Sequence, residues 1–274
     1  MKQGCFLFIL WVIILAVAVV NFTLKFGIFG GVAAFVLLMA LIVFLYRNSI
    51  RVIIAQMTFD KDHQKGFMWF EKAYKTGKMK THSALFYAYL LLRDGKLQQS
   101  EKMINDILME RRADLSRQDY LNAKLNRALI KWKAADIDAA IEMVQEIYDE
   151  NFRTTAVYGV LGYLYIEKGE YEKAMEINKE AVEYNSDDNI IMDNYALNFL
   201  CLGDIKKSEE LYLALLEKEP DFIEPYYNYG TLLEKRGDKD TAREYYNKAL
   251  TYREKFLSTV SHEEIRNRLD QLGD

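Results

Sequence analysis

Cysteine, proline and histidine are scarce in this chain of 274 residues, which contains two, two and three of them. Cys5 and Cys201 lie far apart, so no pair of cysteines has the spacing of metal ligands. His63, His82 and His262 are isolated from one another, and the sequence has no HExxH motif. We therefore expect no metal site and no cofactor.

Catalytic motifs are also absent. The sequence has no phosphate-binding loop, no GxSxG motif, and no carboxylate pair that stands out from helix surfaces rich in Asp and Glu. Gly27, Gly30 and Gly31 form a close glycine cluster, whose small-xxx-small spacing is typical of packed membrane helices. The sequence thus predicts a protein that is not an enzyme, and an unrecognised catalytic site remains one alternative.

Acidic residues are missing from the first 46 positions, which hold two of the 36 basic residues and none of the 40 acidic ones. The rest of the chain has 34 basic and 40 acidic residues, a formal net charge of −6. This balance argues against nucleic acid as a partner, because nucleic acid normally requires a basic face. No polybasic run follows Arg51, which argues against strong recognition of anionic lipid.

Two long apolar runs lie in this amino-terminal region. Residues 5–22 and 28–46 contain no charged side chain, and each run is about long enough to cross ~30 Å of hydrocarbon as a helix. Only residues 23–27 separate them, so we expect a transmembrane helical hairpin. A cleaved signal peptide is the alternative for the first run, although residues 16–18 make a poor cleavage site and the second run would still anchor the chain.

Basic residues near the two runs predict the orientation of the hairpin. The positive-inside rule counts Lys and Arg close to the ends of the spans. One basic residue, Lys25, lies in the loop, whereas the outer ends are flanked by Lys2, Arg47, Arg51, Lys61 and Lys65. Both termini, and with them the rest of the chain, are therefore predicted to lie on the cytoplasmic side of a plasma membrane.

A repeat with a period of 34 residues organises the rest of the chain. Gly169, Gly203 and Gly237 mark two successive intervals, and large residues precede each glycine with the spacing of one helical face. A glycine after a helix permits the left-handed residue that reverses the chain. The two prolines, Pro220 and Pro225, fall at one boundary between units. Each unit is therefore predicted to be a helical hairpin.

These units resemble the tetratricopeptide repeat family, whose 34-residue pattern has fixed large, glycine and alanine positions. The match is close at Tyr158, Leu161, Gly162, Tyr165, Ala174 and Ala181. The sequence departs from the pattern at Asn178, where an aromatic residue is expected, and at Ser186 and Glu254, where proline is. The resemblance implies an all-α fold, a right-handed α-solenoid of helix hairpins, here preceded by a transmembrane hairpin.

The predicted domain organisation places this solenoid at residues 47–256. Its units are 47–80, 81–120, 121–154, 155–188, 189–222 and 223–256, and a capping helix is expected at 257–274 because Ser261 and Glu264 form a capping-box signature. No proline or glycine occurs between Val32 and Asp60, so the second span can continue unbroken into the first repeat helix. A hinge near residues 47–49 is the alternative.

The resemblance also implies a binding groove, because first-helix side chains at positions 2, 5, 6, 9 and 12 of the family hold an extended peptide or a partner helix. The candidates, called the predicted groove below, are Phe86, Tyr89, Asn126, Leu129, Trp132, Tyr163, Ile166, Asn194, Leu197, Tyr227 and Asn228. The asparagines are candidates to bond a peptide backbone, or else to cap or solvate their helices. The aromatic residues are candidate anchors, or else packing residues for the same chain.

The predicted function is that of a non-catalytic, membrane-anchored scaffold or adaptor that binds a peptide or amphipathic helix of a protein partner at the cytoplasmic face. A homo-oligomer is compatible with this function. The alternative is an accessory factor in envelope assembly or transport that binds a lipid or a hydrophobic small molecule. Few prolines and many Lys, Glu, Asn and Tyr residues favour a bacterial source. The sequence does not name the partner or the pathway.

Overall fold

The computed structural model describes residues 2–59 and 61–273, including every side chain in these ranges except those of residues 2–15 and 18. The described residues form thirteen α-helices and one short 3-10 helix, with no strand among them. They divide into two compact units, residues 1–84 and 85–274, and each is described by itself.

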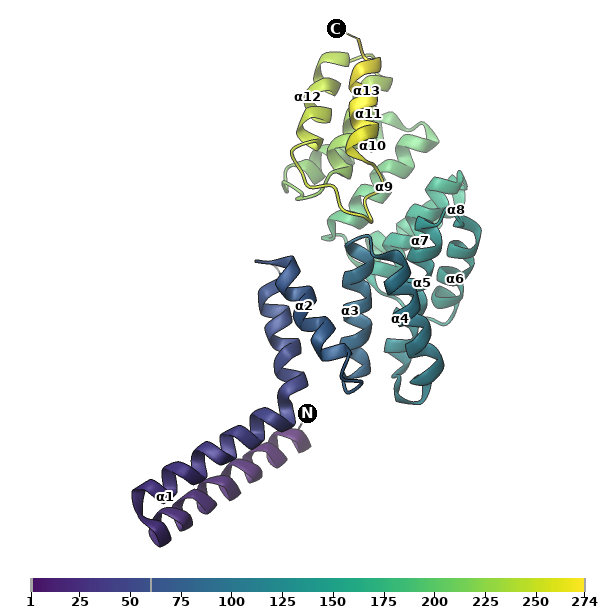
Figure 1. Ribbon diagram of the computed structural model, residues 1–274. Helices are drawn as coiled ribbons and strands as arrows, with labels where there is room; N and C mark the ends of the chain where they lie inside the picture. The colour runs from purple at the N-terminus through teal and green to yellow at the C-terminus, as the bar shows by residue number, and fades with distance from the viewer. Residues whose placement is uncertain (1, 60, 274) are drawn as a thin grey trace. The chain divides into compact units, whose positions relative to one another are not determined.

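The first unit begins with helix α1 (Lys2–Phe59), which doubles back on itself (Figure 1). Gly27 is its one residue with non-helical backbone angles, with φ of 72° and ψ of −176°. Beyond this reversal, a Cβ atom at Gly31 would collide with the Thr23 hydroxyl, and one at Gly30 would collide with the Phe26 side chain. Glycine is thus required where the chain returns past its own turn.

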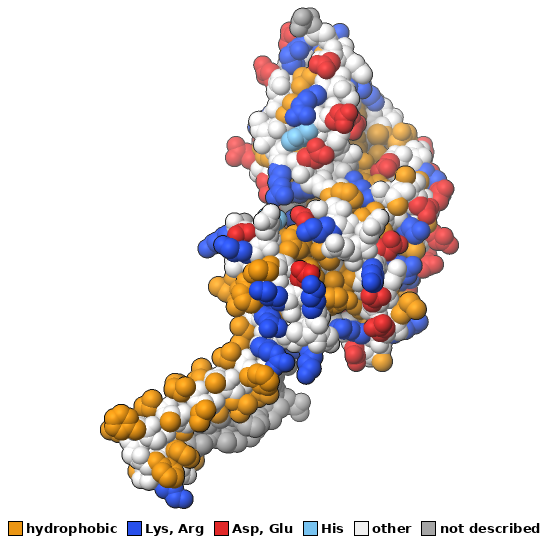
Figure 2. All heavy atoms as spheres, in the orientation of Figure 1, with side chains coloured by type: hydrophobic (Ala, Val, Ile, Leu, Met, Phe, Trp, Pro, Cys, Tyr) orange, Lys and Arg blue, Asp and Glu red, His pale blue; other side chains and the backbone are white. Residues whose placement is uncertain are grey.

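Apolar side chains cover the described surface of α1 (Figure 2). Leu24 and Phe29 are 81% and 92% exposed, and many of the large apolar residues between Val17 and Met57 are exposed with them. Val19–Phe59 is the one stretch, among the described residues, that is long and apolar enough to cross a membrane.

The end of α1 packs against helix α2 (His63–Tyr74). The α1 backbone stays helical from Ile28 to Phe59. Asp62 caps α2, since its side chain accepts a hydrogen bond from the Lys65 amide. The Phe59 ring lies edge-on to that of Phe67, with 5.1 Å between ring centroids, and a Cβ at Gly66 would approach the Phe59 Cα to 2.8 Å. The close packing makes a helical hairpin of these two segments.

Antiparallel helix pairs form the second unit, which begins within α3 (Figure 1). The pairs are α3 (Thr81–Arg93) with α4 (Leu97–Glu110), α5 (Arg117–Lys133) with α6 (Ile137–Asp149), α7 (Thr155–Lys168) with α8 (Tyr171–Tyr184), α9 (Asn189–Leu202) with α10 (Ile205–Leu216), and α11 (Glu224–Lys235) with α12 (Lys239–Ala249). The 3-10 helix η1 (Arg112–Asp114) lies between α4 and α5, and α13 (His262–Gln271) ends the described helices.

A left-handed residue reverses the chain within each of these hairpins. Gly169, Gly203 and Gly237 have φ values of 83°, 85° and 86°, as the repeat pattern predicts, and Gly95 has 76°. The equivalent residue between α5 and α6 is Ala135, with φ of 62°. A Cβ in this conformation costs roughly 1–2 kcal/mol. The α5–α6 hairpin thus makes the same turn with a less suitable residue.

Two hairpins close where the second helix meets a glycine of the first helix. The Tyr246 ring lies over Gly230, whose Cβ, if present, would be 2.8 Å from it. Gly162 faces Asn178 in the same way, and a Cβ there would collide with the Asn178 amide oxygen. Asn178 is 1% exposed and donates a hydrogen bond to the Asn198 side-chain oxygen, at 3.2 Å. The asparagine that departs from the family pattern therefore joins two neighbouring hairpins.

Serine gives two of the hairpins a further bond at equivalent positions. The Ser100 hydroxyl donates to the Ala88 carbonyl at 2.7 Å, and the Ser208 hydroxyl donates to the Ala196 carbonyl at 2.8 Å. Each serine is fully buried, and its hydroxyl finds a hydrogen-bond acceptor on the facing helix of the same hairpin.

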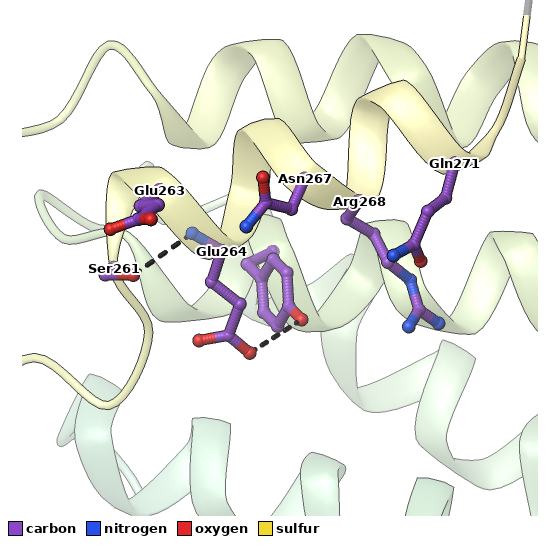
Figure 3. A pocket seen from close by; sticks show the side chains of 7 residues that line it. Ser261, Glu263, Glu264, Asn267, Arg268 and Gln271 are labelled. Carbon is purple, nitrogen blue, oxygen red and sulfur yellow. Dashed lines mark hydrogen bonds between the residues drawn. The ribbon is translucent and has the colours of Figure 1, made fainter.

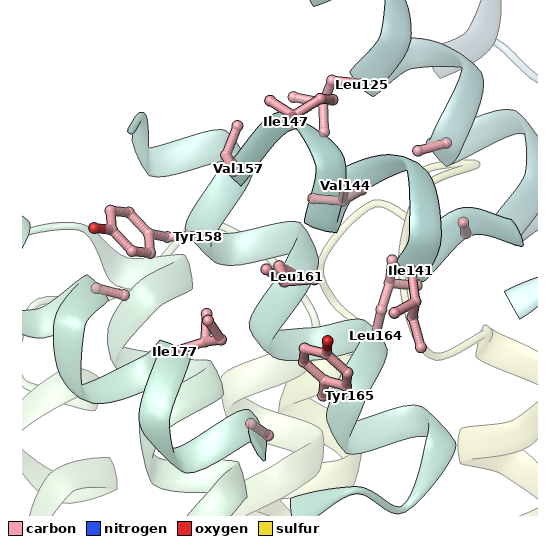
Figure 4. Packing of buried hydrophobic residues seen from close by; sticks show 14 of the residues in the cluster. Leu125, Ile141, Val144, Ile147, Val157, Tyr158, Leu161, Leu164, Tyr165 and Ile177 are labelled. Carbon is pink, nitrogen blue, oxygen red and sulfur yellow. The ribbon is translucent and has the colours of Figure 1, made fainter. Parts of the chain in front are cut away.

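The hydrophobic core runs through the middle of the second unit. Leu161 and Leu164 of α7 contact a cluster that also includes Val144 and Ile147 of α6, all of them nearly inaccessible to solvent (Figure 4). Burying such a side chain contributes about 1.5–3 kcal/mol. A second cluster is built around tyrosines of α10–α12 and includes residues of α13.

Candidate functional site

The predicted groove asparagines contact neighbouring hairpins. Asn194 of α9 donates a hydrogen bond to the Gly159 carbonyl of α7 at 2.8 Å. Asn228 of α11 donates to the Asp193 carboxylate of α9 at 3.1 Å. Asn126 of α5 is 9% exposed. Asn194 and Asn228 therefore each join the first helices of two successive hairpins, and neither side chain caps its own helix.

Trp132 and Tyr163 meet edge-on, with 5.6 Å between ring centroids. The Trp132 indole donates a hydrogen bond to the Glu167 carboxylate at 2.8 Å, and the Lys133 ammonium lies 4.0 Å from the centre of the Trp132 ring. Burial raises the pKa of the Tyr163 hydroxyl above its usual range, and the Glu167 charge adds to this shift. These two predicted anchors thus form one cluster with a cation above it.

The remaining apolar groove residues differ in exposure. Phe86 of α3 is 39% exposed, and Tyr89 is half-buried. Leu129 of α5 and Ile166 of α7 are buried, while Leu197 of α9 is half-buried and packs on both core clusters. Phe86 is therefore the one large apolar residue of the predicted groove that is exposed rather than half-buried or buried.

A non-helical stretch of the same chain lies on this face, and it turns at Lys255–Ser258, where the Ser258 amide donates to the Lys255 carbonyl at 2.9 Å. Residues 250–261, called the crossing segment below, connect α12 to α13 without forming a helix. The Ser258 carbonyl accepts a hydrogen bond from the Lys133 ammonium of α5 at 2.8 Å. The Thr259 amide donates to the Glu224 carboxylate of α11, also at 2.8 Å. The segment therefore bonds to first helices that are three hairpins apart in the sequence.

Two aromatic residues of the crossing segment make further contacts. The Phe256 ring lies against Gly95, at the turn between α3 and α4, where an added Cβ would be 3.2 Å from it. Tyr252 stacks on Tyr226 of α11, with 4.7 Å between centroids and 13° between ring planes. The segment thus reaches from the α11–α12 hairpin back to the α3–α4 hairpin.

Helix α13 follows the crossing segment and packs on α11. Ser261 caps it by accepting a hydrogen bond from the Glu264 amide, as the capping-box signature predicts (Figure 3). Tyr227, a predicted groove residue, donates from its hydroxyl to Glu264 at 3.3 Å, and Arg268 pairs with Glu234 at 2.7 Å. A hollow of about 280 Å³ lies between Tyr227 and this helix.

A carboxylate is buried beneath this face. Asp193 is 4% exposed, and its pKa is raised to about 8, chiefly because burial disfavours the charged form. The nearby Glu224 charge raises the pKa further, while the hydrogen bond from Asn228 lowers it. The fully buried Tyr212 lies nearby, and burial raises its pKa well above the usual value. Among residues 2–59 and 61–273, no group of three His, Cys, Asp or Glu side chains could hold a metal ion.

The family pattern did not identify all the residues of this face. Lys133 lies one position beyond the first-helix positions that the family uses, and nothing in the repeat marks it. The crossing segment was placed partly in the last repeat and partly in a helix from 257, whereas α13 begins at His262. Its bonds to Lys133 and Glu224 come from its backbone, which leaves no signal in the sequence.

Comparison with known proteins agrees with this architecture. Models of the tetratricopeptide repeat match residues 155–188 and 211–244. A tetratricopeptide repeat protein from Parabacteroides merdae ATCC 43184 has a similar solved structure, with a TM-score of 0.66 over 95% of this chain and 98% of that one, at 13% sequence identity. This chain is a tetratricopeptide repeat protein. In this repeat protein, the first match covers α7 and α8, and the second runs from α10 through α11 into α12.

Two curated proteins share part of this repeat protein's sequence. Protein O-mannosyl-transferase TMTC2 of Homo sapiens is 30% identical over 117 residues, which are 38% of this chain and 14% of that protein. The BBSome complex member BBS4 of Bos taurus is 30% identical over 90 residues, which are 33% of this chain and 17% of that protein. The matches span less than a fifth of either relative's length.

Proposed function

We propose that this tetratricopeptide repeat protein is a non-catalytic scaffold or adaptor that binds an extended segment of a protein partner on its first-helix face. The observation that carries the proposal is the crossing segment, a non-helical stretch of the chain that lies on this face through backbone bonds to Lys133 and Glu224. The exposed Phe86 ring and the half-buried Tyr89 offer further aromatic surface on α3. Aromatic anchors of this kind dominate binding energy in many interfaces.

The proposal includes anchoring in a bacterial plasma membrane by two spans, at about residues 5–22 and 28–46. Exposed Leu24 and Phe29 support it, because side chains of this size are unfavourable in water and favourable in lipid. The reversal at Gly27 supports a return of the chain to the side from which it entered. With Lys25 alone in the loop and Arg47 and Arg51 after the second arm, the repeats would lie in the cytoplasm.

Site-specific photocrosslinking in intact membranes tests the binding proposal. A photoreactive residue at Phe86 should capture a discrete protein, while the same residue at Met109, which is 83% exposed on α4, should not. The captured protein, once purified, should bind the wild-type chain directly and bind the Phe86→Ala variant at least about tenfold more weakly. Equal capture from both sites, or capture of lipid alone, would contradict a protein-binding face.

A further inference from the structure

One peptide group of the crossing segment is held at both of its ends. The Ser258 carbonyl and the Thr259 amide belong to the same peptide bond, and they meet the Lys133 ammonium and the Glu224 carboxylate, each at 2.8 Å. A cation on the carbonyl and a carboxylate on the amide form two charge-assisted hydrogen bonds of complementary sign. Because both bonds go to the backbone, they require no particular side chain at either residue.

The two charges are built into the face. Glu224 is 8% exposed, and Lys133 is half-buried, with its pKa lowered by that burial. Carboxylates and ammonium groups are rarely buried without a partner, because removing them from water is costly. The peptide group satisfies both of them at once. Its removal would leave each charge without this partner.

Side chains on either side of the clamped peptide group make contacts that give the site a sequence preference. Phe256, two residues before the clamped bond, places its ring against Gly95 and 5.8 Å from the Lys133 ammonium. Val260, the residue after Thr259, is 4% exposed and belongs to the core cluster of α9–α13. The occupied site therefore selects a non-helical backbone with an aromatic residue two positions before Ser258 and an apolar residue directly after Thr259.

We propose that Lys133 and Glu224 form a clamp for one peptide group of a non-helical partner segment, and that the crossing segment occupies this clamp as an internal ligand. The inference rests on the proposed function and adds the chemistry of the partner, a segment with the aromatic and apolar residues just described. One clamp cannot hold two peptide groups, so the partner must displace residues 252–260. Tethering at both ends gives the internal ligand an effective concentration of about millimolar order, which raises the affinity that a partner needs.

Hydrogen exchange on the full-length protein in detergent micelles tests the clamp. The variants Lys133→Met and Glu224→Gln should each speed exchange of the amides in residues 253–261 by about tenfold or more, the loss expected for a charge-assisted hydrogen bond. Amides in α9 should keep their wild-type rates. The control variants Lys131→Met and Glu210→Gln, at exposed ion pairs, should change neither region. Unchanged exchange in the first two variants would overturn the clamp.

A labelled synthetic peptide with the sequence of residues 250–261 tests the internal ligand. The double variant Phe256→Ala, Thr259→Pro removes the aromatic contact and the clamped amide from the full-length chain, and it should bind the peptide at least about tenfold more tightly than the wild type does. Adding Lys133→Met should abolish this gain, and a peptide N-methylated at Thr259 should bind weakly. The single variant Phe256→Ala should show a smaller gain and covers failure of the double variant to fold. These variants are called opened below, because their crossing segment has lost contacts to the clamp face. Equal binding of the peptide to the wild type and to the opened variants would overturn the proposal.

Crosslinking from Phe86 separates this inference from the proposed function. Stronger capture of the partner by the opened double variant than by the wild type supports competition between the partner and the crossing segment. Equal capture in both leaves the binding face standing and overturns the internal ligand. Tight binding of the synthetic peptide to the opened variant, with no partner captured from Phe86, supports the clamp and contradicts the partner site.

Discussion

Replacing Asp193 with asparagine should stabilise the protein at neutral pH. Asp193 is 4% exposed, and its closest partner is the Asn228 amide, 3.1 Å from one carboxylate oxygen. The pKa of Asp193 is raised to about 8, mainly by burial and further by the Glu224 charge. An asparagine at this position has nearly the same shape, retains an oxygen that accepts from Asn228, and carries no charge that burial would penalise.

The size of the effect follows from the two pKa values. An aspartate in the unfolded chain titrates near about 3.9. Between that pH and about 8, the folded state binds a proton that the unfolded state does not, so the free energy of unfolding falls by about 1.4 kcal/mol per pH unit. The stability contributed by protonated Asp193 is fully present below pH ~3.9 and is lost progressively up to pH 8. The cost reaches about 4 kcal/mol at pH 7.

Urea unfolding, followed by circular dichroism of the full-length protein in micelles, measures this difference. The Asp193→Asn variant should exceed the wild type in free energy of unfolding by less than about 1 kcal/mol at pH 4.5 and by several kcal/mol at pH 7, so the two curves diverge as pH rises. Asp187→Asn is the matched control, because Asp187 is 98% exposed. A difference that stays constant with pH would refute the reasoning.

Three further predictions concern the turns, the hairpin contacts and the membrane. Ala135→Gly should stabilise the chain by about 0.5–1 kcal/mol in the same unfolding assay, because it relieves a left-handed alanine; a loss of stability would contradict this. Gly162→Ala should destabilise the chain by about 1–3 kcal/mol, because the added methyl group collides with the buried Asn178 amide, and unchanged stability would argue against that contact. In intact cells, an impermeant thiol reagent should label Lys25→Cys but not Lys61→Cys; the reverse pattern would invert the proposed topology.

The repeat architecture could be predicted because its determinants are local and periodic. Gly169, Gly203 and Gly237 recur at one period and adopt the left-handed conformation that their position predicts. The structure places Asn178 opposite Gly162, and the sequence did not reveal why an asparagine replaces an aromatic residue there. That reason is a bond to a neighbouring hairpin, which depends on three-dimensional contact.

The candidate site could be predicted only in part, for the same physical reason. Family positions led to Trp132 and Tyr163, which do lie together. They did not lead to the crossing segment, because its carbonyl and amide groups are present in every residue and carry no sequence signal. Nor did they show that Asn194 and Asn228 bond adjacent helices, since burial of an amide depends on what packs around it.

The unbroken stretch of α1 from Ile28 to Phe59 has a consequence for the geometry of an anchored protein. Its 32 residues make about 48 Å of helix, whereas about 20 residues suffice to cross the hydrocarbon. The remaining residues are the first arm of the hairpin that α2 completes, since the Asn48 amide donates to the Thr76 hydroxyl at 2.7 Å, so this hairpin would begin directly at the end of the membrane span. Each residue inserted between Tyr46 and Arg47 would shift that hairpin by about 1.5 Å along the helix and turn it by about 100°. Helical phase, rather than a loose tether, would then set the direction in which this hairpin faces the lipid surface.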